Sequence, residues 1–200
     1  MKSPLLLRTV SLVYLATAKV TSISPHFEPG GTGAALNIKQ FVNTTDPIWT
    51  YNSTENTFIL CKVDQTSDIT EERYIFNRSY YAGYHNWTTL DGKGTFTSED
   101  PASVDVVLKK DSTSGYTYSD KLLYTDNYTS CGIFFVKPMN GDANGWYEHR
   151  VKNSSITKRK DKGCTSFFKN MTTRGRKVFR PHCLHMLRIG NATYSRWELH

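Results

Sequence analysis

The segment that decides the fold is Arg73-Tyr74-Ile75-Phe76-Asn77-Arg78-Ser79-Tyr80, which has the composition of a β-strand. Asn77 begins an Asn-x-Ser/Thr glycosylation sequon, and a glycan cannot be buried. Because side chains alternate between the two faces of a strand, the odd-numbered positions are expected to face outward. The inward face, which mixes aromatic rings with a charge, is then Tyr74, Phe76, Arg78 and Tyr80.

A second strand, expected over residues 145–153, has the same property. Asn153 begins another sequon, and an outward Asn153 assigns Trp146, Glu148, Arg150 and Lys152 to the interior, provided that no bulge breaks the alternation and the strand does not end early. Charged groups are rarely buried without partners, so a solid two-sheet core would tolerate this mixture poorly. The two faces favour a barrel whose interior holds water and a ligand.

The rest of the chain continues as short β-rich runs separated by turn residues. Hairpin turns are expected at Asp91-Gly92, Asp100-Pro101, Ser114-Gly115 and Asn140-Gly141. Several short strands at this spacing are typical of a sandwich or an up-and-down barrel, so the fold class is all-β. Short helices are expected over 34–42 and 164–171. The other expected strands are 48–51, 57–63, 87–90, 94–97, 103–109, 121–125 and 129–137.

The chain has the features of a secreted glycoprotein. Lys2, an apolar run over 5–15 and the small residues Ala16-Thr17-Ala18 predict a signal peptide over 1–18, followed by a single domain over 19–200. No later run approaches the roughly 20 apolar residues of a membrane-spanning helix, so no membrane partner is expected. Eight sequons predict an extracellular, glycan-coated surface, and they begin at Asn43, Asn52, Asn77, Asn86, Asn127, Asn153, Asn170 and Asn191.

Four cysteines and an uneven charge distribution complete the composition. An even number of cysteines in a secreted chain predicts two disulfides, and spacing leaves three connectivities open among Cys61, Cys131, Cys164 and Cys183. Residues 150–200 carry 13 basic and two acidic side chains, which suits either a heparin-like polyanionic glycan or a solvated surface. No metal site, cofactor or nucleic-acid partner is predicted.

Three motifs then carry a family resemblance. Asp46-Pro47-Ile48-Trp49 is followed by Thr57-Phe58-Ile59-Leu60-Cys61, and Leu123-Tyr124-Thr125-Asp126 leads into Ser130-Cys131-Gly132-Ile133-Phe134-Phe135-Val136. Trp146-Tyr147-Glu148 precedes the last two cysteines. In order and spacing, over roughly residues 34–188, these motifs resemble the tick salivary lipocalins, the histamine-binding protein family.

The resemblance implies a fold and a role. It implies an eight-stranded antiparallel lipocalin barrel over about 34–153, with a short N-terminal helix and a C-terminal helix packed outside within the tail 160–200. It also implies the pairings Cys61–Cys183 and Cys131–Cys164. Members sequester small host mediators, such as histamine, serotonin or lipids, and are not enzymes. A monomeric, secreted protein that evades host defence is therefore expected.

Histamine is a cation, so its pocket needs carboxylates and aromatic faces. By resemblance, Asp46 and Trp49 match an acidic and an aromatic residue of one family amine site, and Glu148 matches an acid of the other. Family residues are replaced at Gly132 and Arg150. The expected ligand-binding residues are Asp46, Trp49, Tyr74, Phe76, Arg78, Trp146, Glu148 and Arg150.

Two alternatives remain open on the sequence. Inward-facing Arg78 and Arg150 suit an anionic lipid mediator, such as a leukotriene or fatty acid, because guanidinium binds carboxylate in a bidentate manner. The basic segments 158–160 and 174–180 suit a protein or heparin-like glycan partner, with the barrel as a scaffold. Acids alone in the interior favour an amine, whereas arginines there favour an acid.

Overall fold

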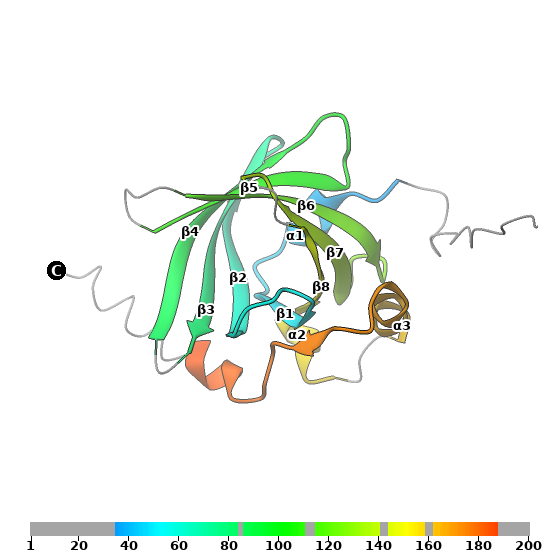
Figure 1. Cartoon of the computed structure of the whole chain (residues 1–200). Coiled ribbons are helices and arrows are strands. Elements are labelled where there is room, and N and C mark those ends of the chain that lie inside the picture. Colours follow the sequence, from blue (N-terminus) through cyan, green and yellow to red (C-terminus); the bar gives the residue numbers. More distant parts are fainter. Residues whose placement is uncertain (1–34, 84–85, 111–114, 141–143, 159–161, 188–200) are drawn as a thin grey trace, which may run out of the picture. The chain divides into compact units, whose positions relative to one another are not determined.

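The chain folds into a closed antiparallel β-barrel, and the computed structural model describes residues 35–83, 86–110, 115–140, 144–158 and 162–187. Each strand pairs with the next, and β1 (Ile48–Ser53) closes the barrel by pairing with both β8 (Trp146–Lys152) and β2 (Ile59–Ile69) (Figure 1). The remaining barrel strands are β3 (Arg73–Ala82), β4 (Asn86–Phe96), β5 (Ser103–Lys109), β6 (Tyr116–Thr125) and β7 (Cys131–Pro138). The predicted eight-stranded antiparallel barrel is confirmed.

Strand β4 departs from the prediction, which placed a turn at Asp91-Gly92. The strand runs through this dipeptide without a break, so the predicted turn is wrong. Gly92 lies opposite Phe76 of β3, and a Cβ atom on Gly92 would lie 2.5 Å from the Phe76 ring. Gly94 lies opposite Tyr74 in the same way. These glycines make room for two inward aromatic rings.

The predicted turn at Asp100-Pro101 does separate two strands, β4 and β5. Strand β6 begins at Tyr116, well before the expected residue 121, and this places Asp120 inside the sheet. Strand β8 ends at Lys152, and Asn153 begins a short helix, α2 (Asn153–Ile156), that the sequence did not predict.

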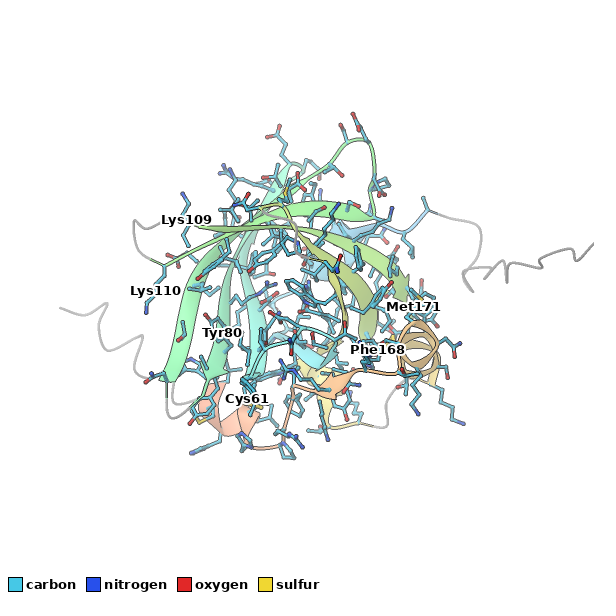
Figure 2. The ribbon with its side chains drawn as sticks, in the orientation of Figure 1. Cys61, Tyr80, Lys109, Lys110, Phe168 and Met171 are labelled. Atoms are coloured by element: carbon cyan, nitrogen blue, oxygen red, sulfur yellow. A yellow bond between two sulfur atoms is a disulfide. The ribbon has the colours of Figure 1, made fainter. Side chains whose placement is uncertain are left out.

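The two predicted helices are present in shortened or shifted form. Helix α1 (Ile38–Val42) is capped by Asn37, whose side-chain oxygen accepts from the backbone N–H groups of Lys39 and Gln40. Helix α3 (Lys162–Met171) packs outside the barrel beside β7 and β8 (Figure 1). Phe168 of α3 is buried against the barrel wall, and Met171 at the helix end is exposed (Figure 2).

The segment after α3 also contributes to the sheet. Within it, β9 (Arg176–Lys177) pairs with the end of β1. Backbone hydrogen bonds from Val178 and Phe179 to the Tyr51 carbonyl oxygen continue this contact. The C-terminal segment is thereby fixed along β1.

The barrel wall separates two apolar clusters. The inner cluster includes Phe41 of α1 with Tyr74, Phe76 and Phe134 from the strands. The outer cluster lies between the wall and the C-terminal elements, and it contains Trp49, Phe168, Phe179 and all four cysteines. The disulfides are Cys61–Cys183 and Cys131–Cys164, as the resemblance implied. They tie the C-terminal elements to the outside of the barrel.

The sequon asparagines that the structure describes are all accessible. Asn43, Asn86, Asn127 and Asn170 are exposed, and Asn52, Asn77 and Asn153 are partly exposed. Several predictions lie outside the described residues: the signal peptide, Asn191, the first residue of the expected helix 34–42, and Arg159 with Lys160. None of the helices among the described residues has the length and apolar character that crossing a membrane requires.

Candidate ligand-binding site

A chain of five alternating charges runs through the barrel interior: Glu55, Lys62, Glu148, Arg150 and Asp120. Lys62 Nζ lies 3.2 Å from a Glu55 oxygen and 2.5 Å from Oε1 of Glu148. Arg150 Nε donates to Oε2 of Glu148 at 2.7 Å, and its Nη2 lies 2.7 Å from Oδ2 of Asp120. We call this connected set the ion chain. Its members come from β8, β6, β2 and the loop after β1, so the fold assembles it.

Glu148 is at the centre of the ion chain and is fully buried. Its Oε1 also accepts a hydrogen bond from the Trp146 indole N–H at 2.9 Å. Burial alone would raise the pKa of Glu148, but the charges of Lys62 and Arg150 outweigh burial and hold this pKa well below its ordinary value. Glu148 is therefore an ionised carboxylate that already has two cationic partners.

A separate ion pair lies beside the chain. Arg78 donates from Nε and Nη2 to the two carboxylate oxygens of Asp64, both at 2.7 Å. The guanidinium of Arg78 also lies 5.5 Å from the centre of the Phe76 ring. This bidentate pair is neutral as a unit and occupies the guanidinium in the way that a ligand carboxylate would.

The ion chain has more acids than bases. Three carboxylates alternate with two cations, so its formal charge is −1, and a carboxylate ends it on either side. At the inner end, Asp120 is fully buried, and no described protein group donates a well-directed hydrogen bond to its oxygens. Arg150 is close enough to Asp120 for an ion pair but is poorly aligned. The ion chain by itself therefore carries one negative charge that its own two cations do not balance.

The outer end of the ion chain opens into a pocket of about 330 Å³ at the mouth of the barrel. We call it the mouth pocket. The rings of Tyr118 and Trp146 meet edge to face there, with centroids 5.6 Å apart. Asp120 and Glu148 lie two residues further along the same faces of β6 and β8, directly below these rings. The pocket is lined by Glu55, Asn56, Thr57, Gly115, Tyr116, Thr117, Tyr118, Pro138, Asn140 and Trp146.

Comparison with solved structures identifies the fold. Apocrustacyanin C2 superposes with a TM-score of 0.52 at 16% sequence identity, over 72% of this chain and 79% of that one. Lobster apocrustacyanin A1 gives a TM-score of 0.52 at 14% identity, over 76% of this chain and 89% of that one. The fold is that of a lipocalin.

Apocrustacyanin C1 agrees, with a TM-score of 0.51 at 16% identity over 76% of this chain and 89% of that one. At this identity the likeness concerns the fold alone. No protein-family model and no curated protein sequence matches the chain. The comparisons therefore establish the fold, and the ligand depends on the residues of this chain itself.

Six of the eight predicted ligand-binding residues lie in the barrel interior. Trp146 lines the mouth pocket, and Glu148 and Arg150 belong to the ion chain. Arg78 lies beside the chain, next to Phe76. Tyr74 stacks on Phe76 at 4.8 Å, deeper in the barrel, where burial and the negative charge of Asp120 raise its pKa above the ordinary value. The direction inferred from the sequons agrees with this placement.

The other two predicted residues lie elsewhere. Trp49 pairs across the sheet with Val63 and Val151 of the outer cluster, and its ring meets Phe179 at 5.2 Å. Asp46 accepts from the backbone N–H of Ser154 in α2. The structure therefore does not bring Asp46 and Trp49 together with Glu148.

Sequence reasoning missed four charged members of the interior: Glu55, Lys62, Asp64 and Asp120. The last lay outside the strand expected over 121–125, and Glu55 lies in a loop. Lys62 could have been found by strand parity, because Cys61 and Val63 on either side of it face the outer cluster, whereas Asp64 lay one residue beyond the strand expected over 57–63. No sequon lies on that strand to mark its outward face.

The described residues offer no free thiolate for a metal. The two groupings of three metal-binding residue types, Cys61 with His182 and Cys183 and Cys131 with His149 and Cys164, each contain both cysteines of a disulfide. A cysteine in a disulfide cannot act as a thiolate ligand. These groupings are part of the framework of the fold.

Proposed function

We propose that this protein is a secreted binding protein that sequesters a small aromatic monocation, histamine or another biogenic amine such as serotonin, in the mouth pocket. The observation that carries the proposal is the ion chain, whose formal charge is −1 and whose outer carboxylate, Glu55, lines the pocket. A ligand with one positive charge would compensate this excess. The role is sequestration without catalysis.

The pocket chemistry supports an aromatic amine. The ammonium group of the ligand would pair with Glu55, which has the longer of the two Lys62 ion pairs at 3.2 Å. The ligand ring would pack against Tyr118 and Trp146, whose faces also attract a cation. The resemblance to the tick salivary histamine-binding proteins supports the same class of ligand and a role in evading host defence.

An anionic lipid fits the interior less well. Both arginines are inside, but Arg78 is occupied by Asp64, and Arg150 is paired with Glu148 and Asp120. A fatty carboxylate would have to displace a buried acid from its partner. Below the ion chain, the inner cluster of Phe41, Phe76 and Phe134 fills the space that an acyl chain would need.

The proposal is tested by calorimetric titration with histamine and serotonin. Glu55→Gln removes the carboxylate that the ammonium group would contact and is expected to weaken amine binding about tenfold, the loss of one charged contact. Asp120→Asn removes one negative charge deeper in the ion chain and is expected to weaken binding by less, because Asp120 does not line the pocket. Asp46→Asn is the matched control, since Asp46 contacts α2 and is expected to leave affinity unchanged. Absence of heat with the unsubstituted protein at high micromolar amine would refute the proposal.

A further inference from the structure

The guanidinium of Arg176 is engaged with the loop between β1 and β2, residues 54–58, which we call the mouth loop. Its Nε donates to the Glu55 carbonyl oxygen at 3.2 Å and its Nη1 to the Ile59 carbonyl oxygen at 2.8 Å. Its Nη2 donates to the Thr57 hydroxyl at 3.0 Å. Through one rigid, planar group, Arg176 therefore binds two residues of the mouth loop, Glu55 and Thr57, and the first residue of β2, Ile59.

Arg176 is itself held in place. It lies in β9, where it pairs with Ser53 at the end of β1, and the orange C-terminal segment runs beside β1 in Figure 1. The backbone N–H of Cys61 donates to the Val178 carbonyl oxygen at 3.0 Å, and the Cys61–Cys183 disulfide fixes the same segment further along. The mouth loop is thus fastened to a segment more than a hundred residues away in the chain.

The mouth loop supplies one wall of the mouth pocket. Glu55, Asn56 and Thr57 all line it, and the Glu55 carboxylate reaches inward to Lys62. Arg176 binds the main-chain oxygen of Glu55, so it acts on the position of that carboxylate without touching it. Ser53 assists from the other side, because its hydroxyl accepts from the Glu55 backbone N–H at 3.0 Å.

We propose that Arg176 is a positioning residue, which fixes the mouth loop so that Glu55 faces the pocket and thereby sets the preference for a cationic ligand. The preference for a cation rests on the proposed function; the fixing of the loop does not. The proposal also gives the basic C-terminal segment a role in the binding site: this arginine supports the pocket from outside and is not free to bind a polyanion.

The test begins with hydrogen exchange of the mouth loop, which needs no ligand. Arg176→Gln is expected to speed exchange of the hydrogen-bonded amides of Thr54 and Glu55 at least about tenfold, because the charge-assisted hydrogen bonds that hold the loop are lost. Arg174→Gln, at an exposed arginine two residues away, is the control and is expected to change nothing there. Unchanged exchange in Arg176→Gln would overturn the proposal.

A second variant separates positioning from charge. Arg176→Lys keeps the positive charge but cannot reach three acceptors from one planar group, so it is expected to resemble Arg176→Gln. Urea unfolding of each Arg176 variant with and without Glu55→Gln gives a double-mutant cycle. The loss of free energy of unfolding caused by Glu55→Gln should fall by at least half when Arg176 is glutamine or lysine. If Arg176→Lys behaves like the unsubstituted protein, only the positive charge matters and the proposal is wrong. If the losses of unfolding free energy from the Arg176 and Glu55 substitutions are additive, Arg176 does not act on Glu55.

Histamine titration then links the loop to binding. Arg176→Gln and Arg176→Lys are expected to bind histamine about tenfold more weakly, with Arg174→Gln unchanged. If the unsubstituted protein binds no amine, the proposed function fails. Hydrogen exchange of the mouth loop and the double-mutant cycle would still test whether Arg176 positions the loop. Histamine affinity unchanged in a variant whose loop exchange has risen would overturn the link to selectivity.

Discussion

Glu148 is the residue on which the charged interior depends most. It is fully buried and pairs with Lys62 and Arg150 while also accepting from Trp146. Removing one partner from a buried ion pair leaves charges that no water can solvate. We predict that Glu148→Gln lowers the free energy of unfolding by about 3–5 kcal/mol, measured by urea denaturation at neutral pH.

Ionisation of Glu148 also makes the free energy of unfolding depend on pH. Because the folded-state pKa of Glu148 is held below its ordinary value, its stabilising effect is present above about pH 4.3 and is lost as the pH falls further. The stability difference between the protein and Glu148→Gln should therefore shrink at pH 3. Glu99→Gln, at an exposed glutamate, is the control and should cost little at either pH. A difference that stays constant from pH 7 to pH 3 would contradict the assignment.

Among the strands, β4 shows how a side chain on a neighbouring strand can require a glycine. Gly92 leaves space for the Phe76 ring of β3, and a Cβ atom there would lie 2.5 Å from it. We predict that Gly92→Ala lowers the free energy of unfolding by about 1–3 kcal/mol, the usual cost of overpacking a core. Lys93→Ala, at the exposed neighbouring position, is the matched control, and equal costs for the two variants would count against this account.

The same strand explains where sequence prediction failed and where it succeeded. Asp91-Gly92 has the composition of a hairpin turn, and only the ring of Phe76 across the strand pair shows why a glycine is needed in a continuous strand. Asn77 succeeded because a glycan must face water, a constraint that acts on a single residue and needs no knowledge of its neighbours. The inward face of β3 was therefore predictable. The inward face of β8 was also predicted correctly, although Asn153 lies in α2 and not on the strand.

The balance of charge inside the barrel was not predictable from two strands. The sequence did not indicate the pairing of Arg78 with Asp64 or of Arg150 with Asp120, because these acids lie on other strands whose inward faces no sequon marked. Asp46 and Trp49 were carried over from the resemblance, and the structure places them at a helix and in the outer cluster. Long-range pairing, which a linear pattern does not encode, decided each case.

At the scale of the whole molecule, two disulfides connect the barrel to the C-terminal elements. Cys61–Cys183 spans 122 residues and Cys131–Cys164 spans 33. Loop-closure entropy predicts costs of about 5 kcal/mol and about 4 kcal/mol on removal, the longer loop costing more. Urea unfolding of the two paired Cys→Ala variants under non-reducing conditions measures both. Greater loss on removing Cys131–Cys164 would show that packing of α3 outweighs chain entropy.

The ion chain inside this barrel carries one negative charge that its own cations do not balance, and we propose that a small aromatic cation balances it. The most direct measurement is calorimetric titration with histamine and, in parallel, with imidazoleacetate, which has the same ring and the opposite charge. The ion chain predicts that histamine binds at least about tenfold more tightly than imidazoleacetate, because histamine gains one charged contact and the carboxylate of imidazoleacetate is repelled. Equal affinities, or tighter binding of imidazoleacetate, would contradict the account.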